Sequence, residues 1–233
     1  MKILLACFPL IVLPLFADEF LEAEYGGSDP NHLEPVDAHS SAYRENLAKC
    51  LLVTSSELGL MITLPSFEPE SAVAIYGTGA TTTSLPSLDP DPKPEDIPED
   101  KFFVTSTKAK QRIPGTVIPD DAKIEVVRHD LQISKQLAVA IQRAWARMLL
   151  RTKYPETSYA GLDGERYEFG LFVRGIGDLK GEIWSPSKGL PAEIVALGKK
   201  LETFAEAEKP LSVEGEAELI KELKAFEARA KEP

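Results

Sequence analysis

The spacing of the apolar side chains changes in the second half of this 233-residue chain, between Leu149 and Arg166. Before that point, apolar residues recur in steps of three and four, which is the spacing of one face of a helix. After it, they alternate with polar residues, as on a half-buried strand. The helix-face residues are Leu137, Ile141, Trp145, Met148 and Leu149. The two patterns together predict a helix from Leu131 to Leu149 that is followed closely by strands.

The two ends of this predicted helix carry suitable residues. Asp130 or Ser134 can cap its start by accepting backbone N–H bonds. Arg147 and Arg151 suit the negative C-terminal end of the helix dipole. Pro155 closes the segment, because the residue before a proline is disfavoured in helical geometry.

Two strands are predicted after the helix, joined by the short connection Gly175–Asp178. A connection of this length is typical of a β-hairpin. The apolar side of the first strand consists of Tyr167, Phe169, Leu171 and Val173; on the second strand Leu179, Gly181, Ile183 and Ser185 alternate with Lys180, Glu182 and Trp184. An isolated hairpin is marginally stable in water, so a helix or further strands must cover its apolar side. The preceding helix is the nearest element that can do so.

The N-terminal half contains shorter apolar runs, most of which predict strands. Leu60–Leu64, Ser71–Tyr76, Lys101–Ser106 and Lys123–Val127 each have the length and composition of a strand. The run Leu47–Val53 can form a hairpin with the first of these strands. It can equally form a short helix, because its apolar residues are also helically spaced.

The remaining segments complete the predicted fold. The residues 77–100 are rich in Pro, Thr, Ser and Asp, so they are expected to form a long exposed loop. Pro191–Lys209 and the residues after Ser212 have helical apolar stripes and a short link, which favours an antiparallel pair. The predicted fold class is α+β, a small, mostly antiparallel sheet with helices packed on one face and a C-terminal helical hairpin.

The N-terminus has the features of an export signal. Lys2 is followed by an apolar run to Phe16 that is too short to span a bilayer comfortably, and acidic residues follow Ala17. We therefore interpret residues 1–17 as a signal peptide, with no membrane span after its removal. The expected location is periplasmic or secreted, and the alternative is a lipoprotein anchored at Cys7.

The acidic residues are concentrated in the N-terminal part of the chain. Residues 18–100 contain 17 Asp+Glu against 3 Lys+Arg, whereas residues 101–233 contain 20 against 22. No basic stripe for nucleic acid is present. We interpret residues 18–45 as an acidic flexible lead-in. Residues 46–233 are interpreted as a single α+β domain that contains the Pro/Thr/Asp-rich loop 77–100.

Neither the cysteines nor the N-terminal histidines indicate a reactive or metal site. Without Cys7, Cys50 is the remaining cysteine, so no internal disulfide can form. Its apolar neighbours 51–53 favour burial, and no basic or histidine neighbour is present to activate the thiol. His32 and His39 lie in the acidic lead-in, where ordering a loose segment around an ion costs entropy. We expect a solvated segment rather than a metal site there, and no cofactor.

The catalytic motifs in this chain are weak. Ser185-Pro-Ser-Lys188 matches S-x-x-K, the nucleophile motif of penicillin-recognising enzymes, which needs the lysine one helical turn beyond the serine. Pro186 and Gly189 disfavour that helix. Gly175-Ile-Gly177 lacks the third glycine of a dinucleotide-binding loop. His129, between a predicted strand and the helix, is expected to be a cap or a surface residue.

Four further carboxylates belong to the hairpin region: Asp163, Glu168, Asp178 and Glu182. Two of them can approach each other across the strands and act as acid and base. A solvated sheet face is the favoured interpretation.

The aromatic side chains of the hairpin are the candidates for binding. Phe172 and Trp184 fall opposite the apolar sides of their strands, so they are predicted to be neighbours on a second face. That face is expected to be covered by the C-terminal helices or by a partner. Phe172, Trp184, Tyr167 and Glu182 are the candidate binding residues. With Trp145 and Phe169, the aromatic residues can also line a ligand cleft, although packing in the core is favoured for them.

Three runs in this block resemble secreted bacterial proteins of unknown function. They are Trp145-Ala-Arg-Met-Leu-Leu-Arg-Thr-Lys-Tyr-Pro155, Asp163-Gly-Glu-Arg-Tyr-Glu-Phe169 and Gly181-Glu-Ile-Trp-Ser-Pro186, and the likeness covers about a third of the chain. The resemblance implies no activity. The expected function is that of an exported, non-catalytic envelope protein that binds a protein or an envelope component. The alternatives are an unrecognised hydrolase and a small-ligand carrier with an aromatic cleft.

Overall fold

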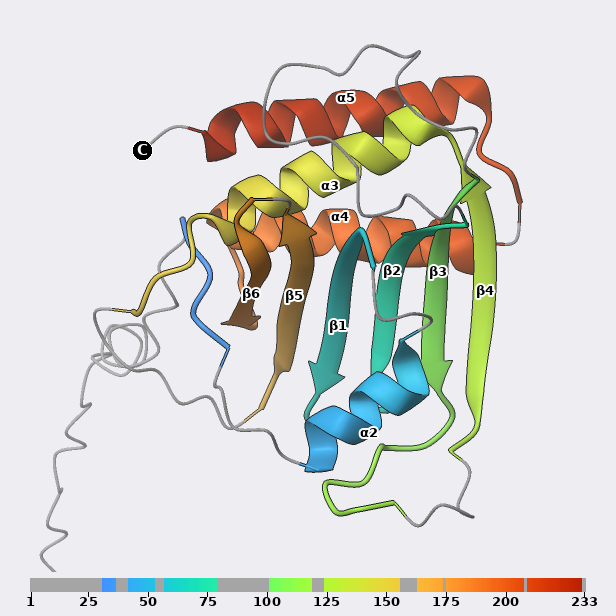
Figure 1. Ribbon diagram of the computed structural model, residues 1–233, viewed down its shortest axis with the longest axis vertical. Helices are drawn as coiled ribbons and strands as arrows, with labels where there is room; N and C mark the ends of the chain where they lie inside the picture. Colours follow the sequence, from blue (N-terminus) through green and yellow to red (C-terminus); the bar gives the residue numbers. More distant parts are fainter. Residues whose placement is uncertain are drawn as a thin grey trace, which may run out of the picture.

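The computed structural model describes residues 31–36, 42–52, 57–78, 101–118, 124–155, 163–173, 175–207 and 209–231. Within these ranges the strands form a six-stranded antiparallel sheet in the order β4-β3-β2-β1-β5-β6 (Figure 1). The predicted signal peptide with Cys7, His39 and most of the predicted loop 77–100 lie outside the described residues.

The chain forms a meander and then returns to its first strand. The strands are β1 (Gly59–Pro65), β2 (Ser71–Gly77), β3 (Phe102–Ala109), β4 (Val126–Ile133), β5 (Glu165–Val173) and β6 (Gly177–Trp184), and the helices are α2 (Ala42–Leu51), α3 (Lys135–Leu149), α4 (Gly189–Glu206) and α5 (Val213–Ala230). After β4, α3 leads the chain back so that β5 pairs with β1 and β6 extends the sheet. The α+β fold class, with helices packed against an antiparallel sheet, is confirmed.

The main core lies between the sheet and α3 and α4, with α5 stacked on these two helices. Its centre is Trp145 of α3, which is fully buried. The Trp145 ring packs edge-to-face on Phe169 of β5, with 5.9 Å between ring centroids, and its indole N–H donates to the Leu60 carbonyl at 3.2 Å. The helix therefore covers the apolar side of the hairpin, as the sequence predicts, and both aromatic residues belong to the core.

The C-terminal helices form the predicted antiparallel pair. Lys200 of α4 lies 2.7 Å from Glu222 of α5, and Arg229 of α5 pairs with Glu193 of α4. The more extensive contacts of α5, however, are with α3. The sequence does not predict this contact, because the apolar stripe of a helix does not identify the helix that it will meet.

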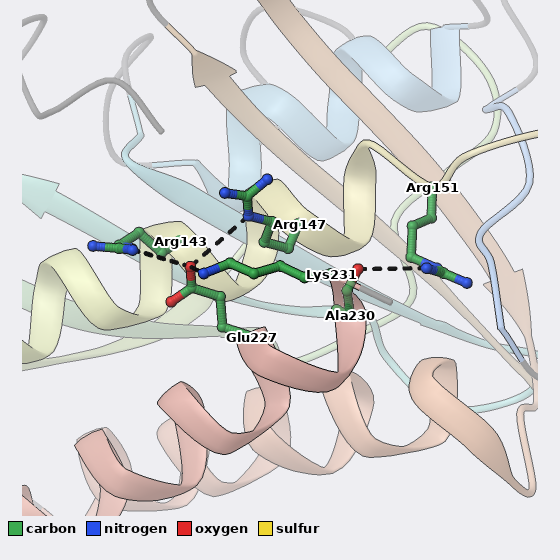
Figure 2. Close-up of polar contacts among 6 residues, drawn as sticks. All are labelled: Arg143, Arg147, Arg151, Glu227, Ala230 and Lys231. Carbon is green, nitrogen blue, oxygen red and sulfur yellow. Dashed lines mark hydrogen bonds and ion pairs between the residues drawn. The ribbon is translucent and has the colours of Figure 1, made fainter. Parts of the chain in front are cut away.

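A buried carboxylate joins α5 to α3 (Figure 2). Glu227, whose side chain is 7% exposed, lies with Oε1 3.2 Å from Arg143, 3.8 Å from Arg147 and 3.1 Å from Lys231. Three cations from the two helices thus converge on one acid. Lys231, the C-cap of α5, thus pairs with Glu227 four residues earlier in the same helix.

The boundary between β4 and α3 differs from the prediction. Ser134 is the N-cap of α3, with its hydroxyl accepting from the Leu137 N–H. Asp130 and His129 both lie inside β4, so neither caps the helix nor lies in a connection. The reason is that β4 pairs with β3 along its whole length, and this pairing prevails over the helical spacing that begins at Leu131.

The run Leu47–Val53 follows the helical alternative. Residues 47–51 belong to α2, and the alternative hairpin with Leu60–Leu64 is wrong. The physical reason is that β1 already pairs with β2 on one side and with β5 on the other, so both of its edges are occupied.

The acidic lead-in proposed for residues 18–45 is partly folded. Glu34 and Glu182 exchange backbone hydrogen bonds of 2.8 and 2.7 Å, so residues 31–36 lie along the edge of β6. Leu33 is fully buried in the main core, beside Gly181. Ala42 begins α2. These stretches have contacts that the sequence does not predict, because a single buried leucine and one bridge can place a segment that has no periodic pattern.

Candidate functional site

A groove lies on the second face of the sheet, between α2 and the β5–β6 hairpin, with a volume of about 160 Å³. We call it the hairpin groove. Its apolar lining consists of Val36, Leu47, Ala48, Leu52, Leu60, Ile62, Phe169 and Gly170, and its charged lining consists of Arg44, Glu168 and Lys180. The face is the one opposite α3, α4 and α5, as the position of α2 in Figure 1 shows.

The missing side chain at Gly170 keeps the floor of the groove open. Gly170 lies opposite Leu60 on one side and Lys180 on the other. A Cβ atom added there would lie 3.8 Å from Leu60 Cδ2, which is ordinary van der Waals contact. The glycine is therefore not required by crowding of the backbone, and the space in front of it is available to a ligand.

Hydrogen bonds to buried groups hold α2 in place beside the groove. The Tyr43 hydroxyl donates to Glu70 at 2.7 Å, and Glu70 is fully buried. The Asn46 amide donates to two backbone carbonyls in the loop 113–116, both at 2.8 Å. Burial, together with the hydrogen bond to Glu70, raises the pKa of Tyr43, so its hydroxyl remains a donor at neutral pH. The wall of the groove is thus a fixed element.

One of the predicted carboxylates, Glu168, lines the charged side of the groove, and a second, Glu182, lies next to it on β6. Glu168 and Glu182 lie directly opposite each other on β5 and β6, as the acid–base hypothesis requires. Arg44 of α2 lies 3.2 Å from Glu168 and 3.6 Å from Glu182, and Arg166 lies 3.7 Å from Glu182. Both carboxylates are engaged by guanidinium groups that tie α2 to the hairpin. The arrangement supports a structural role for the pair.

Phe172 and Trp184 lie on the second face, as predicted, but they are not neighbours. The strand register places Phe172 opposite Asp178, near the turn, and Trp184 opposite Arg166, at the other end of the hairpin. The C-terminal helices lie on the opposite face and cover neither residue. Phe172 is 47% exposed and lies two residues from Gly170 on the same side of β5, so it extends the apolar surface of the groove.

Tyr167 and Trp184 have packing roles away from the groove. Tyr167 is buried on the helix side of the sheet, where its hydroxyl donates to Glu165 and Lys199 lies 5.7 Å from its ring centroid. Burial raises the pKa of Tyr167, with a further contribution from the hydrogen bond to Glu165. The Trp184 ring packs against the Gly164 backbone at the corner before β5. The sheet separates Tyr167 from the hairpin groove.

The S-x-x-K motif does not form a catalytic arrangement. Ser185 and Lys188 precede α4, which begins at Gly189, so the lysine is not one helical turn beyond the serine. The Ser185 hydroxyl accepts from the Glu165 N–H at 2.9 Å, and this hydrogen bond joins the end of β6 to the start of β5. Among the described non-glycine residues, Ser185 alone has a positive φ, 36°. This backbone conformation turns the chain out of β6.

Cys50 and His32, the remaining potentially reactive residues, are also packed among neighbouring side chains. Cys50 is half-buried on α2 within the second apolar cluster, and burial raises the pKa of its thiol. His32 is buried beside Leu33. The described ranges contain no group of three or more His, Cys, Asp or Glu residues that could hold a metal ion. In the same ranges, no helix has the length and apolarity needed to cross a membrane.

The sequence does not predict the hairpin groove, because α2, β1, β5, β6 and the segment 31–36 all contribute to it. These elements meet only through the sheet order. One local signal is present: Gly170 interrupts the strand pattern of β5, and a glycine inside a strand often marks a close approach or a site left open.

Comparisons with protein-family models, with curated proteins and with solved structures find no match for this chain.

Proposed function

We propose that this chain is an exported, non-catalytic envelope protein that binds another protein through the hairpin groove and Phe172. The observation that carries this proposal is the size and lining of the groove. Pockets that enclose a small-molecule ligand usually measure about 300–1,000 Å³. A groove of about 160 Å³ is smaller than these and suits one large apolar side chain that a partner presents. Its size thus favours a protein partner over the carrier function.

The surface around the groove has the layout of a protein interface. Protein interfaces combine an apolar centre with a polar rim, and a few aromatic or arginine anchors supply most of the binding energy. Here Leu60 and Gly170 lie in the centre, Lys180 lies at the charged side, and Phe172 supplies an aromatic side chain that is 47% exposed. The partner is expected to insert an apolar side chain beside α2 and to cover Phe172.

Two further observations support a non-catalytic, exported protein. The residues proposed for hydrolysis have structural partners, since Ser185 bonds to Glu165, and Arg44 engages the carboxylates of Glu168 and Glu182. Export is inferred from the charged start, apolar run and acidic boundary of residues 1–17. The resemblance to secreted bacterial proteins agrees with this location.

The test uses two substitutions at one position of the groove floor. Gly170→Ile fills the groove with a branched side chain that is favourable in a strand, whereas Gly170→Ala adds only a Cβ for which there is room. A photo-crosslinking amino acid at Ala48, which lines the groove, is introduced into both variants and into the unmodified chain. The same amino acid at Ala217, an exposed position on α5, is the control for nonspecific capture.

The expected result is a crosslinked partner that depends on the groove. In cells of origin, Ala48 should capture a product that Ala217 does not, and Gly170→Ile should abolish this product while Gly170→Ala retains it. Replacement of Phe172 with alanine should weaken the same product. Equal crosslinking by both Gly170 variants, with both proteins folded, would show that the groove is not the binding site.

A further inference from the structure

Within the part of the chain that the structure describes, the edge strand farthest from the hairpin groove, β4, pairs with a neighbouring strand on one side only. All eight residues of β4 pair with β3, without a bulge or a proline, while Arg128, Asp130 and Gln132 are exposed. Natural proteins usually block a long edge with such features, because its unpaired backbone groups are a template for another strand. Of these blocking features, β4 has charged side chains, those of Arg128 and Asp130. Their arrangement identifies the partner.

The hydrogen-bond pattern between β3 and β4 shows which residues of β4 direct their backbone N–H and C=O groups away from β3. We call these the outward residues. The Lys110 N–H donates to the Glu125 carbonyl at 2.9 Å, so Glu125 directs its backbone groups toward β3. In an antiparallel pair this direction alternates along the strand. The outward residues are therefore Val126, Arg128, Asp130 and Gln132. A new antiparallel strand can exchange hydrogen bonds only with these four.

We propose that β4 pairs with β4 of a second copy of this chain, antiparallel and centred on His129. Hydrogen-bonded pairs must join outward residues of the two copies, which restricts the register. A pairing centred on Arg128 places the two Arg128 side chains opposite each other, and one centred on Asp130 places the two Asp130 side chains opposite each other. The pairing centred on His129 sets each Arg128 opposite an Asp130 of the other copy. It avoids like charges and overlaps nearly the whole strand.

The remaining positions are compatible with this register. Val126 lies opposite Gln132 of the other copy, and Val127, which is 39% exposed, lies opposite Leu131. His129 faces its own copy at the two-fold axis. The interface adds about eight backbone hydrogen bonds, two for each hydrogen-bonded pair, and continues the sheet from one copy into the other. Two-fold symmetry satisfies both edges at once, so no open β4 edge remains.

The side chains that select the register are already oriented on one face. Arg128 donates to the Thr107 hydroxyl at 3.2 Å, and Asp130 accepts a hydrogen bond from Thr105, so both charged groups stand on the second face of the sheet. Opposite charges that are directly opposed across an antiparallel pair stabilise it, and like charges destabilise it. The β4 edges of two copies are therefore complementary in charge as well as in the positions of their backbone hydrogen-bonding groups.

Charge reversal tests the proposal by sedimentation over a range of protein concentrations. The unmodified protein is expected to show a monomer–dimer equilibrium. Arg128→Asp or Asp130→Arg alone places like charges opposite each other and should raise the dissociation constant roughly tenfold or more. The double variant Arg128→Asp/Asp130→Arg reverses both charges and should restore dimerisation. Asp178→Arg, an equal change of charge at the hairpin end, is the control and should have no effect.

A cysteine at the axis tests the register directly, in a Cys50→Ser background. Residues at a non-hydrogen-bonded antiparallel position have Cα atoms about 4.5 Å apart, within the range for a disulfide. His129→Cys should therefore crosslink two copies on mild oxidation, whereas Gln132→Cys, which faces Val126, should not. A protein that stays monomeric at every concentration, a double variant that fails to recover, or equal crosslinking at both positions would overturn the proposal. The hairpin groove lies on another part of the sheet. The outcome of these dimerisation tests therefore does not decide the outcome of the Gly170 experiment.

Discussion

Glu168 lies directly opposite Glu182 in the β5–β6 register, and Arg44 of α2 lies within 3.6 Å of both carboxylates. Like charges in this position repel each other across a strand pair. The arginine supplies the opposite charge from a separate element, so the hairpin and α2 depend on each other electrostatically. Because α2 is one wall of the hairpin groove, this contact also helps to hold the wall against the hairpin.

Replacing the arginine should release α2 from the hairpin. Arg44→Met keeps most of the side-chain length but leaves the two opposed carboxylates without this guanidinium, and we expect the free energy of unfolding to fall by about 1–2 kcal/mol, since the site is partly exposed. Denaturant titration measures the loss. The double variant Arg44→Met/Glu168→Gln removes one of the facing charges and should recover part of the stability. Strictly additive effects of the two substitutions would mean that the two residues are not coupled.

Leu33 should be the residue that holds the segment 31–36 on β6. Leu33→Ala removes a fully buried side chain, and such changes cost about 2–5 kcal/mol. Limited proteolysis should cut near residues 31–36 in the variant much faster than in the unmodified protein. Gly181→Ala offers a second route, because the added Cβ would lie 3.0 Å from the Leu33 side chain and 2.8 Å from Thr152 Oγ1. Asn31→Ala, at an exposed position, is the control, and equal cleavage of all three variants would contradict the anchoring role.

Docking of the same segment should weaken as pH rises through the acid range. Burial raises the pKa of Glu34 above its ordinary value of 4.5, so the folded state binds a proton at this carboxyl more readily than the unfolded state does. The stabilisation is complete below the unfolded pKa and is lost as pH rises through the folded pKa. Glu34→Gln should therefore be more stable than the unmodified protein at about pH 7, by less than about 1 kcal/mol, with no difference below about pH 4. Thermal unfolding at a series of pH values measures this difference. An equal difference in stability at about pH 4 and about pH 7 would show that the titration of Glu34 is not its cause.

Removing the charge of Glu227 should loosen α5. Glu227→Gln leaves Arg143, Arg147 and Lys231 close together without their shared carboxylate, and we expect a loss of about 1–3 kcal/mol, because the acid is buried while the cations are partly exposed. Hydrogen exchange should increase in the last turns of α5 before it increases in β5. Glu218→Gln, at an exposed position of the same helix, is the matched control. Unchanged exchange in α5 would show that apolar packing alone holds the helix on α3.

The elements that the sequence predicts most closely are those with local patterns. The hairpin at 165–184 and the capping of α3 by Ser134 follow from alternation, turn residues and a single hydroxyl. The sequence predicts that this strand ends at Val127, whereas β4 ends at Ile133. Helical spacing and strand pairing compete over residues 131–134, and the partner strand is not visible in the sequence. Residues 31–36 have a single buried apolar side chain, Leu33, so no pattern identifies them.

The candidate site likewise has parts that follow from a local sequence pattern and parts that depend on contacts between distant segments. Alternation along β5 and β6 places Phe172 and Trp184 on the second face, but the register that separates them depends on which residues are opposed across the turn. The hairpin groove is assembled from α2, β1 and the hairpin. Its existence follows from the sheet order, which a one-dimensional pattern does not contain, and from the absence of a side chain at Gly170, which is the one local signal in the sequence.

The bridge between Glu34 and Glu182 also sets an order of events in folding. The segment 31–36 is synthesised well before β6, the strand on which it docks, so its native contacts close a loop that contains most of the chain. Contacts of such long range slow folding. A ribosome-bound chain that lacks β6 therefore cannot bury Leu33 in its native position. For a protein proposed to be exported, this delay favours crossing the membrane as an unfolded chain, with the final closure of the sheet edge left to the far side.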